Sequence, residues 1–373
     1  MVEVQDIFRE FGQKFIERYN PPPHVCKSIR AISNCRTEAL GAHADHCDNC
    51  GYTHISYNSC RDRHCPKCQA LRKEMWIMDR QSELLPVPYF HVVFSLPNDL
   101  DVITMQNQDI IYNILFRASA ETLKELSADP KYLGAQPGFI SILHTWGQTL
   151  TLHPHVHMIV PGGGLALENT QWKNSGKKFF LPVKVMSSKF RGKFLHYLKQ
   201  ANLSFHGPQE YLADLSQFDG LISRLFNKDW YVYCKRPFKT TDSVLEYLGR
   251  YTHRVAISNH RILKFENDIV TFKWRDYSDH SAEKVMSLHA LEFMRRFLLH
   301  ILPPGFTKIR HYGFLGSAVK AVKLILCRRL LGCKPIIKVI MSTVELIKKL
   351  TGIDISICPN CGVPFTKYLA ASP

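Results

Sequence analysis

The residues most able to do chemistry in this chain are the two histidines of the stretch His155-Val156-His157. An apolar run, 158–160, follows them and is typical of a β-strand, and the next residues, Pro-Gly-Gly-Gly, predict a sharp turn. Successive strand side chains point to opposite faces, so both imidazoles should project from one face, about 6–7 Å apart. Such a pair can hold one divalent cation. The alternative is an amphipathic strand with two half-buried histidines.

A third ligand would come from the strand expected at 138–146, which a Gly-Gln-Thr turn joins to the histidine strand. We expect the two strands to form an antiparallel hairpin. If residue 144 pairs with residue 155, His144 lies on the same face as His155 and His157. His144 is therefore the preferred third ligand.

Two other side chains compete for this role. His153 is the main rival, but Pro154 lacks a backbone N–H and is best placed at the first residue of a strand. That placement would leave His153 just outside the strand. Gln148, in the turn, is a weaker candidate.

Two tyrosines form a second candidate group, since Tyr247 and Tyr251 stand at i and i+4 in a helix expected at 243–254. Both would lie on one helix face, one turn apart, with Arg250 and Arg254 around them. An aromatic core stripe with solvated arginines is the alternative. Tyrosine has a pKa of about 10, so as a nucleophile it needs a base, nearby cations or a metal-polarised target.

The cysteines indicate metal binding rather than disulfide bonds, because six of the twelve occur in Cys-x-x-Cys pairs. Two such pairs close together predict a tetrahedral, four-thiolate zinc site that only stabilises the fold. The expected ligands are Cys47, Cys50, Cys65 and Cys68. Candidate ligands of a second zinc ion are Cys35, Cys60 and His64.

Near the end of the sequence, Cys358 and Cys361 form half of a further zinc knuckle. Cys327 and Cys333 could supply the other half, although their spacing is unusual for a knuckle.

The balance of charges predicts a polyanionic partner, and nucleic acid before a membrane. The formal net charge is +16, and such an excess favours binding to nucleic acid, although a merely basic protein is the alternative. The arginines and lysines of 61–73 are expected to touch DNA phosphates. No signal peptide and no apolar run of membrane-spanning length is visible, so we expect a cytoplasmic, nucleoid-associated protein.

The elements that must position these residues predict an α+β fold. Alternating apolar residues indicate strands at 87–96, 138–146, 151–161 and 229–237, and a hairpin at 261–275 whose turn is Asn267-Asp268. Helices are expected between them, including 107–128 and 287–302. We therefore expect an antiparallel sheet with the metal on its exposed face and helices packed on the other.

Three parts are expected along the chain. Residues 1–84 would be a helical and zinc-binding domain, 85–305 the domain with the histidines and tyrosines, and 306–373 a basic helical region that ends in Cys-x-x-Cys. No internal repeat and no low-complexity tract divides them further.

Three motifs stand in a fixed order: the cysteine segment 60–68, His-Pro-His-Val-His at 153–157 with its Pro-Gly-Gly-Gly, and Tyr-Leu-Gly-Arg-Tyr at 247–251. Together they resemble, over nearly the whole chain, the two-tyrosine HUH transposases of bacterial insertion sequences (IS family ninety-one). These are relatives of rolling-circle replication initiators, conjugative relaxases and Helitrons.

The resemblance implies a sheet of the HUH-endonuclease type and a function in rolling-circle transposition. His155, His157 and a third side chain would hold Mg²⁺ or Mn²⁺, besides the structural Zn²⁺. Tyr247 or Tyr251 would attack single-stranded DNA at element ends and target, forming a 5′-phosphotyrosine bond. The residues expected to bind this DNA are Lys235, Arg236, Arg250 and Arg254.

No phosphate-binding loop of the Gly-x-x-x-x-Gly-Lys-Ser/Thr type occurs in the sequence. A host helicase and the replication machinery are therefore the expected partners. Two other functions stay open: a zinc-dependent DNA-binding regulator without catalysis, and a zinc hydrolase that uses the three histidines.

Overall fold

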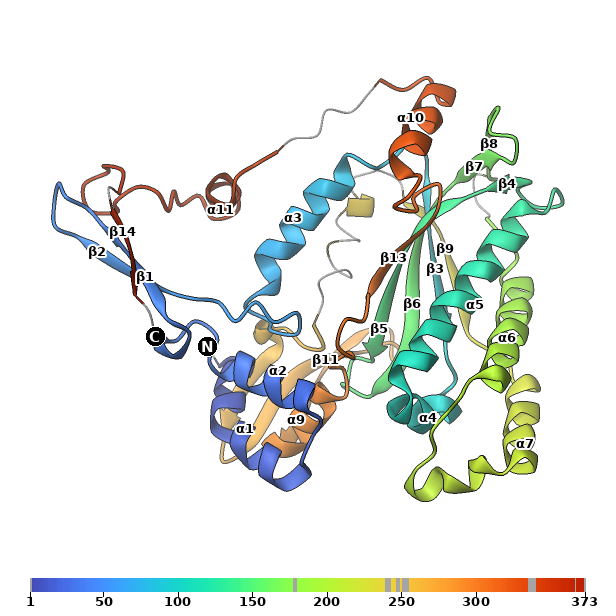
Figure 1. Cartoon of the computed structure of the whole chain (residues 1–373), viewed down its shortest axis with the longest axis horizontal. Helices are drawn as coiled ribbons and strands as arrows, with labels where there is room; N and C mark the ends of the chain where they lie inside the picture. Colours follow the sequence, from blue (N-terminus) through green and yellow to red (C-terminus); the bar gives the residue numbers. More distant parts are fainter. Residues whose placement is uncertain are drawn as a thin grey trace.

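The computed structural model describes residues 2–176, 180–238, 243–245, 249, 255–334, 340–365 and 367–371. It confirms the expected α+β class, with an antiparallel sheet flanked by helices (Figure 1). No described helix is long and apolar enough to cross a membrane.

A five-stranded sheet carries the histidines, in the order β13-β5-β6-β3-β9, with every neighbouring pair antiparallel. Its strands are β3 (Tyr89–Ser95), β5 (Gly138–Trp146), β6 (Leu152–Pro161), β9 (Val232–Phe238) and β13 (Ile309–Gly313). The strands expected at 87–96, 138–146, 151–161 and 229–237 are confirmed.

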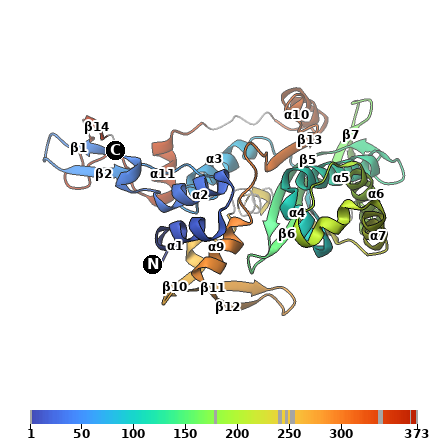
Figure 2. The same ribbon diagram turned by 60° about the horizontal axis from the view of Figure 1, so that its bottom comes forward.

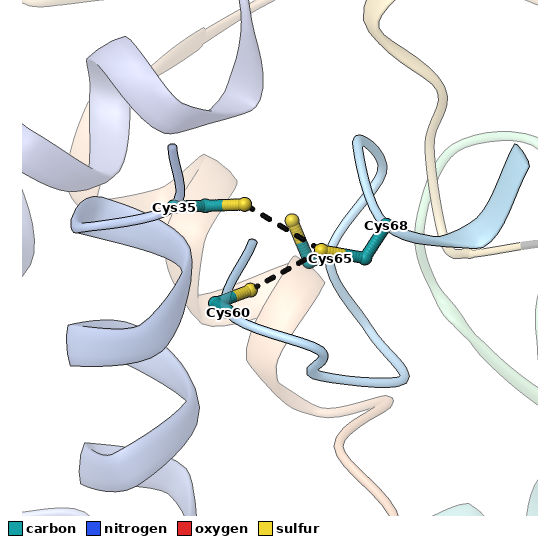
Figure 3. Close-up of side chains that lie close together, drawn as sticks. All are labelled: Cys35, Cys60, Cys65 and Cys68. Atoms are coloured by element: carbon teal, nitrogen blue, oxygen red, sulfur yellow. Dashed lines mark hydrogen bonds between the residues drawn. The ribbon is translucent and has the colours of Figure 1, made fainter. Parts of the chain in front are cut away.

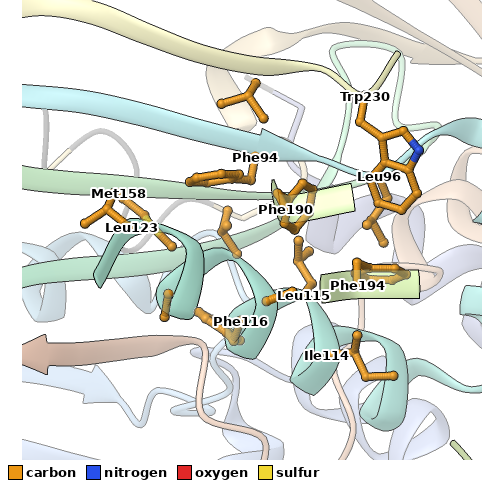
Figure 4. Close-up of a cluster of buried hydrophobic side chains, with 14 of the residues drawn as sticks. Phe94, Leu96, Ile114, Leu115, Phe116, Leu123, Met158, Phe190, Phe194 and Trp230 are labelled. Atoms are coloured by element: carbon orange, nitrogen blue, oxygen red, sulfur yellow. The ribbon is translucent and has the colours of Figure 1, made fainter. Parts of the chain in front are cut away.

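One face of this sheet packs on the helices α5 (Gln108–Ala128), α6 (Val183–Gln200) and α7 (Leu215–Phe226). Because strand side chains alternate, Val156 and Met158 point into this core while His155 and His157 do not. Phe94, Leu115, Phe116, Phe190, Phe194 and Trp230 fill it (Figure 4). Each such fully buried side chain stabilises the fold by about 1.5–3 kcal/mol, so the back of the histidine strands is rigidly held.

The opposite face is apolar at one end and bears the histidines at the other. Ile140, Ile142 and Ile159 belong to a core that α10 (Lys320–Leu330) covers, together with Val244 and Leu245. The histidines come next on this face, where His144 follows Ile142 on β5 and His157 precedes Ile159 on β6.

A second core joins the beginning of the chain to a three-stranded sheet. Helices α1 (Val4–Tyr19) and α2 (Pro23–Ser33) pack on α9 (Ala290–Leu298) and on strands β10 (Ile262–Glu266), β11 (Ile269–Asp276) and β12 (Ala282–His289). Asn267 and Asp268 form the expected turn, with φ of 48° and 64°. The helix expected at 287–302 begins only at residue 290, because 287–289 end strand β12.

The cores cross both boundaries that the sequence suggests, at 84/85 and at 305/306. The second core takes residues from 4–35 and from 256–301, and β13, beyond residue 305, is an edge strand of the histidine sheet.

Another small sheet, in the order β14-β1-β2, lies apart from the five-stranded sheet and from β10-β11-β12 (Figure 2). Its strands are β1 (Ala42–His46), β2 (Thr53–Tyr57) and β14 (Lys367–Ala371). The end of the chain thus adds a strand to the N-terminal hairpin.

The remaining elements are η1 (Glu38–Leu40), α3 (Gln69–Gln81), η2 (Asn98–Leu100), α4 (Asp101–Gln106), β4 (Ala135–Gln136), β7 (Gly163–Ala166), β8 (Trp172–Asn174), η3 (Gly207–Ala213), η4 (Asn259–Arg261) and α11 (Thr343–Thr351).

Candidate functional site

Three imidazoles meet on the face of the large sheet that α5 and α6 leave uncovered. His144 pairs directly with His155 across β5 and β6, so the expected register is confirmed. The ring of His144 lies 4.6 Å from that of His157 and 5.6 Å from that of His155, between centroids. Ligand nitrogens of all three lie within 4.8 Å of one another, which is a spacing that one metal ion can bridge.

The backbone fixes the ring of His155. Its Nδ1 donates to the carbonyl of His153 at 2.6 Å. In metal-binding histidines one ring nitrogen commonly donates to a carbonyl while the other binds the ion. His155 shows the first half of that arrangement.

Neither rival of His144 belongs to the three-histidine group, although the ring of His153 lies 4.9 Å from that of His155. Strand β6 begins at Leu152, so His153 lies inside it. The expectation that Pro154 is the first residue of this strand is therefore wrong. His153 shares the strand face with His155 but is not one of the three clustered imidazoles. The Gln148 amide donates to the Tyr277 hydroxyl at 2.9 Å.

A fourth histidine, His91 on β3, supports the cluster and was not expected from the sequence. Its Nε2 shares a 2.8 Å hydrogen bond with Nδ1 of His157, and both side chains are buried. Burial, with smaller contributions from Lys235 and His155, lowers the pKa of His91 to about 3. His91 is therefore neutral near pH 7 and holds the ring of His157 in place. The sequence does contain a signal for His91. It lies in the strand expected at 87–96, where the alternation of side chains places it on the face that was expected to be exposed.

Strand β9 forms the edge of the sheet beside the histidines and carries exposed aromatic rings. Tyr233 pairs with Val93 of β3, and its ring lies 6.2 Å from that of His91. Tyr231 lies parallel to it, with ring centroids 6.5 Å apart and an interplanar angle of 7°. The two rings are 63% and 40% exposed, for Tyr231 and Tyr233. Lys235 continues the same row and pairs with His91.

On the other side of the cluster, the Trp146 ring stacks on His144 at 4.9 Å between centroids. Trp146 also lines a cavity of about 150 Å³ with Lys308 and Val255. Burial lowers the pKa of Lys308 to about 7, with a smaller effect of Arg63. A largely apolar cavity, with Arg63, Arg72 and Lys308 in its lining, thus lies beside Trp146 and the imidazoles.

The predicted nucleophiles Tyr247 and Tyr251, and the predicted DNA-binding residues Arg250 and Arg254, lie outside the described residues, as does the side chain of Arg236. The structure does describe Val244 and Leu245, before the tyrosines, and Gly249 between them. Val244 and Leu245 are buried in the core with Ile142 and Ile159. The backbone at Gly249 touches α3, since a Cβ there would lie 2.5 Å from Cδ1 of Ile77.

The chain is described again from Val255, which lines the cavity beside Trp146. Both flanks of the tyrosine segment therefore pack on the side of the sheet that bears the histidines.

The cysteines form two groups, and neither has the composition that the sequence suggested. Cys35 and Cys60 both lie 3.5 Å from Cys68, between sulfurs, and Cys65 completes this group (Figure 3). The four sulfurs lie within 4.8 Å of one another, and a tetrahedral zinc site requires about 3.8 Å between sulfurs. Cys68 also stands at the N-cap of α3, where the helix dipole favours a thiolate.

Cys47 and Cys50 do not join Cys65 and Cys68, so the predicted four-cysteine set is wrong. Both lie at the tip of the β1–β2 hairpin, which carries them away from the other pair. They meet Cys358 and Cys361 instead, because strand β14 pairs with β1 and returns the end of the chain to this hairpin.

The suggestion that Cys327 and Cys333 complete the terminal knuckle is also wrong. Cys327 is buried in the core under α10, and neither residue belongs to a described group of metal-ligating side chains.

His64 is not a ligand, because both of its ring nitrogens are engaged elsewhere. Nδ1 donates to Asp62 at 3.2 Å, and Nε2 accepts from the backbone N–H of Leu302 at 3.2 Å. Burial lowers its pKa, which keeps the ring neutral. The sequence placed His64 near the cysteines correctly but could not show these partners.

The basic residues of this module are only partly available to DNA. Arg63 donates to the carbonyls of Leu302, Pro303 and Phe306, and Lys67 pairs with Glu3. Two of the cations that we expected on phosphates are therefore engaged within the protein, Arg63 with residues 302–306 and Lys67 with Glu3.

Two family models match the chain. The model described as "Transposase zinc-binding domain" (Zn_Tnp_IS91) matches residues 7–96, and the one described as "Putative transposase" (Y2_Tnp) matches residues 138–323. The first contains the group Cys35, Cys60, Cys65 and Cys68, which supports Zn²⁺ as the ion of that domain.

Two relatives extend the match to almost the whole chain. "Putative transposase y4qJ" of Sinorhizobium fredii (strain NBRC 101917 / NGR234) is 45% identical over 368 residues, covering 96% of this chain and 92% of the relative. "Transposase for insertion sequence element IS801" of Pseudomonas savastanoi pv. phaseolicola is 28% identical, covering 79% and 70%.

Among solved structures, two of the conjugative relaxase TrwC with DNA are similar to 66% of this chain. They are 13% and 12% identical, cover 73% and 75% of the relaxase chains, and have TM-scores of 0.25 and 0.24. At these TM-scores the likeness carries no argument.

Proposed function

This chain belongs to the insertion-sequence transposases that carry an IS91-type zinc-binding domain, and from that premise we propose how it acts on DNA. It cuts and rejoins single-stranded DNA at element ends through a tyrosine, with the three-histidine cluster as its metal centre. The observation that carries this proposal is the meeting of His144, His155 and His157 on the sheet face opposite α5 and α6, on which the flanks of the tyrosine segment also pack.

The three imidazoles suit a divalent cation. They converge to within 4.8 Å, and the rings of His155 and His157 are already oriented by the His153 carbonyl and by His91. A bound Mg²⁺ or Mn²⁺ would polarise the scissile phosphodiester and stabilise the charge on the departing 3′ oxygen. Phosphate oxygens would complete the mixed nitrogen and oxygen shell that these ions accept.

In the proposed reaction the hydroxyl oxygen of Tyr247 or Tyr251 attacks phosphorus. The bond from phosphorus to the 3′ oxygen breaks, the tyrosine proton passes to solvent or a base, and the 3′ oxygen leaves as a hydroxyl. The product is a 5′-phosphotyrosine, whose bond energy permits rejoining by the reverse attack of a 3′-hydroxyl. A second tyrosine would let the protein hold one DNA end while it cuts another.

The exposed row on β9 is the proposed path of the strand toward the metal centre. Tyr231 and Tyr233 offer parallel rings on which bases of any sequence can stack. Lys235 lies next in the row and would meet a phosphate. Because Tyr233 touches His91, a strand that follows this row arrives directly at the cluster.

The test is an adduct assay with a single-stranded oligonucleotide that carries the element end, in Mn²⁺. An oligonucleotide labelled at its 3′ end should leave its label on the protein in denaturant. With a 5′ label, the released fragment should carry a 3′-hydroxyl that a polymerase extends. The double variant Tyr247→Phe/Tyr251→Phe should form no adduct, whereas Tyr211→Phe, at an exposed tyrosine of η3, should behave like wild type.

The competing functions give other results. A zinc-dependent regulator would bind the oligonucleotide without any adduct or cleavage. A zinc hydrolase would cleave it and leave no label on the protein, in wild type and in the double variant alike. Either pattern would overturn the proposal.

A further inference from the structure

Two Cys-x-x-Cys-Gly loops, 47–51 and 358–362, face each other at the small sheet. The sulfurs of Cys47 and Cys361 are 3.5 Å apart and those of Cys50 and Cys358 are 3.6 Å apart, although 314 and 308 residues separate them in sequence. We propose that these four thiolates hold a second structural zinc ion, which fastens the end segment, residues 340–371, to the β1–β2 hairpin. We call this unit the terminal clasp.

The distances suit zinc. All four sulfurs lie within 4.8 Å of one another. With Zn–S bonds of about 2.3 Å, a tetrahedral site sets sulfurs about 3.8 Å apart. The observed contacts need only small adjustments to reach that value.

The two loops have the same backbone, which is the stronger argument. In each loop the N–H of the first cysteine donates to the carbonyl five residues on, and the glycine N–H donates to the carbonyl of the first cysteine, all at 2.9 Å. Gly51 and Gly362 both adopt left-handed conformations, with φ of 71° and 73°. Two matching loops are expected where a tetrahedral ion is bound by two knuckles. A chance cluster of thiols would not require them.

Among its described side chains, the clasp has no apolar core of its own. None of the three hydrophobic clusters found among the described residues includes a residue from 42–57 or from 343–371. Strand β2 is mostly exposed, and the ring stack of Tyr52 on Phe365, at 6.4 Å, is one of the few side-chain contacts. Three short strands with so little apolar packing among their described side chains need another source of stability, and a structural zinc ion would supply it.

The competing chemistry is a pair of disulfides, Cys47–Cys361 and Cys50–Cys358, since these are the closest sulfurs. Disulfide formation would remove four hydrogen atoms and need an oxidant, and it would leave no thiolate for zinc. A second competitor is a zinc ion shared between two chains, each giving one loop. The experiment separates all three.

Native mass spectrometry of the full chain, purified with zinc, should show a monomer that carries two zinc ions. The variant Cys358→Ser/Cys361→Ser should retain one, and Cys333→Ser, a matched change outside both groups, should retain two. One zinc with a mass lower by four hydrogens would overturn the proposal in favour of disulfides. A second zinc found only in dimers would overturn the clasp within one chain.

A cleavage experiment tests the fastening itself. A specific protease site inserted after Ile340, which is 86% exposed, separates the end segment from the rest. After cleavage the fragment should co-elute with the protein in native gel filtration. It should dissociate after zinc chelation and in the Cys358→Ser/Cys361→Ser background. Retention under both conditions would show that zinc does not hold it. Neither experiment depends on DNA cleavage, so both can succeed or fail independently of the proposed function.

Discussion

The histidine cluster and the Cys35 group differ in what positions their ligands. His144, His155 and His157 stand on paired strands whose other face is packed against α5 and α6, so their geometry exists before any ion binds. Cys60 and Cys65 lie in a loop without regular structure, so we expect a bound ion to hold them together. Losing a ligand should therefore remove the reaction in the first case and the local fold in the second.

The largest effect is expected for Cys60→Ser/Cys68→Ser. Zinc contributes about 10–16 kcal/mol to the folding of small zinc modules, which equals or exceeds the stability of a typical domain, about 5–15 kcal/mol. The first eighty or so residues should lose protection in hydrogen exchange, and α1, which shares a core with α9, should follow. Cys26→Ser, in α2 but outside both groups, is the control. Unchanged protection would show that the loop is positioned without an ion.

His155→Ala and His157→Ala should remove most of the cleavage activity and leave the fold intact. Cleavage should fall by about 10³-fold or more, because metal polarisation supplies several kcal/mol of transition-state stabilisation. The melting temperature and the affinity for single-stranded DNA should change little. His153→Ala, on the same strand face but outside the cluster, should cleave normally. A variant that loses cleavage, binding and melting temperature together would place these histidines with the cysteines as structural residues.

Tyr231→Ala and Tyr233→Ala should weaken DNA binding without unfolding, because both rings are exposed. Stacking of one base on one aromatic ring contributes about 1–3 kcal/mol, so each substitution should lower the affinity roughly 5–150-fold. Fluorescence anisotropy with a labelled strand measures this. Tyr277→Ala, exposed on the β11–β12 sheet, is the matched control. Equal affinity in all three variants would remove β9 from the DNA path.

The smallest effect is expected for Lys235→Gln. One phosphate contact contributes to affinity through counterion release, so the slope of log K against log salt should fall by about 0.9 for duplex and 0.7 for single strands. Lys264→Gln, on β10, changes the net charge equally and should leave the slope unchanged. An identical slope in both variants would mean that Lys235 meets no phosphate.

The two regions also differ in how far the sequence could predict them. His144, His155 and His157 belong to neighbouring strands of one hairpin, so strand parity and register sufficed to bring them together. The cysteine groups combine residues from distant parts of the chain. Proximity in sequence favoured joining 47–50 to 65–68, whereas the hairpin β1–β2 separates them.

His91 and His64 show a further limit of spacing arguments. His91 gains its role from a strand partner that lies 66 residues away. His64 loses the role that spacing suggested because the Leu302 backbone occupies one of its nitrogens. Strand parity indicates the face that carries His91, but its contact with His157 and the contact of His64 with Leu302 are tertiary, and no local pattern encodes them.

The pairing of β14 with β1 has a consequence for the order in which this protein is built. Cys50 leaves the ribosome 308 residues before Cys358, and at about 5–20 residues per second this interval lasts roughly 15–60 s. Throughout that time the β1–β2 hairpin has neither its third strand nor its partner loop. The β1–β2 hairpin is therefore completed only after the segment 358–371 has been synthesised, and a nascent chain interrupted before residue 358 leaves it unfinished.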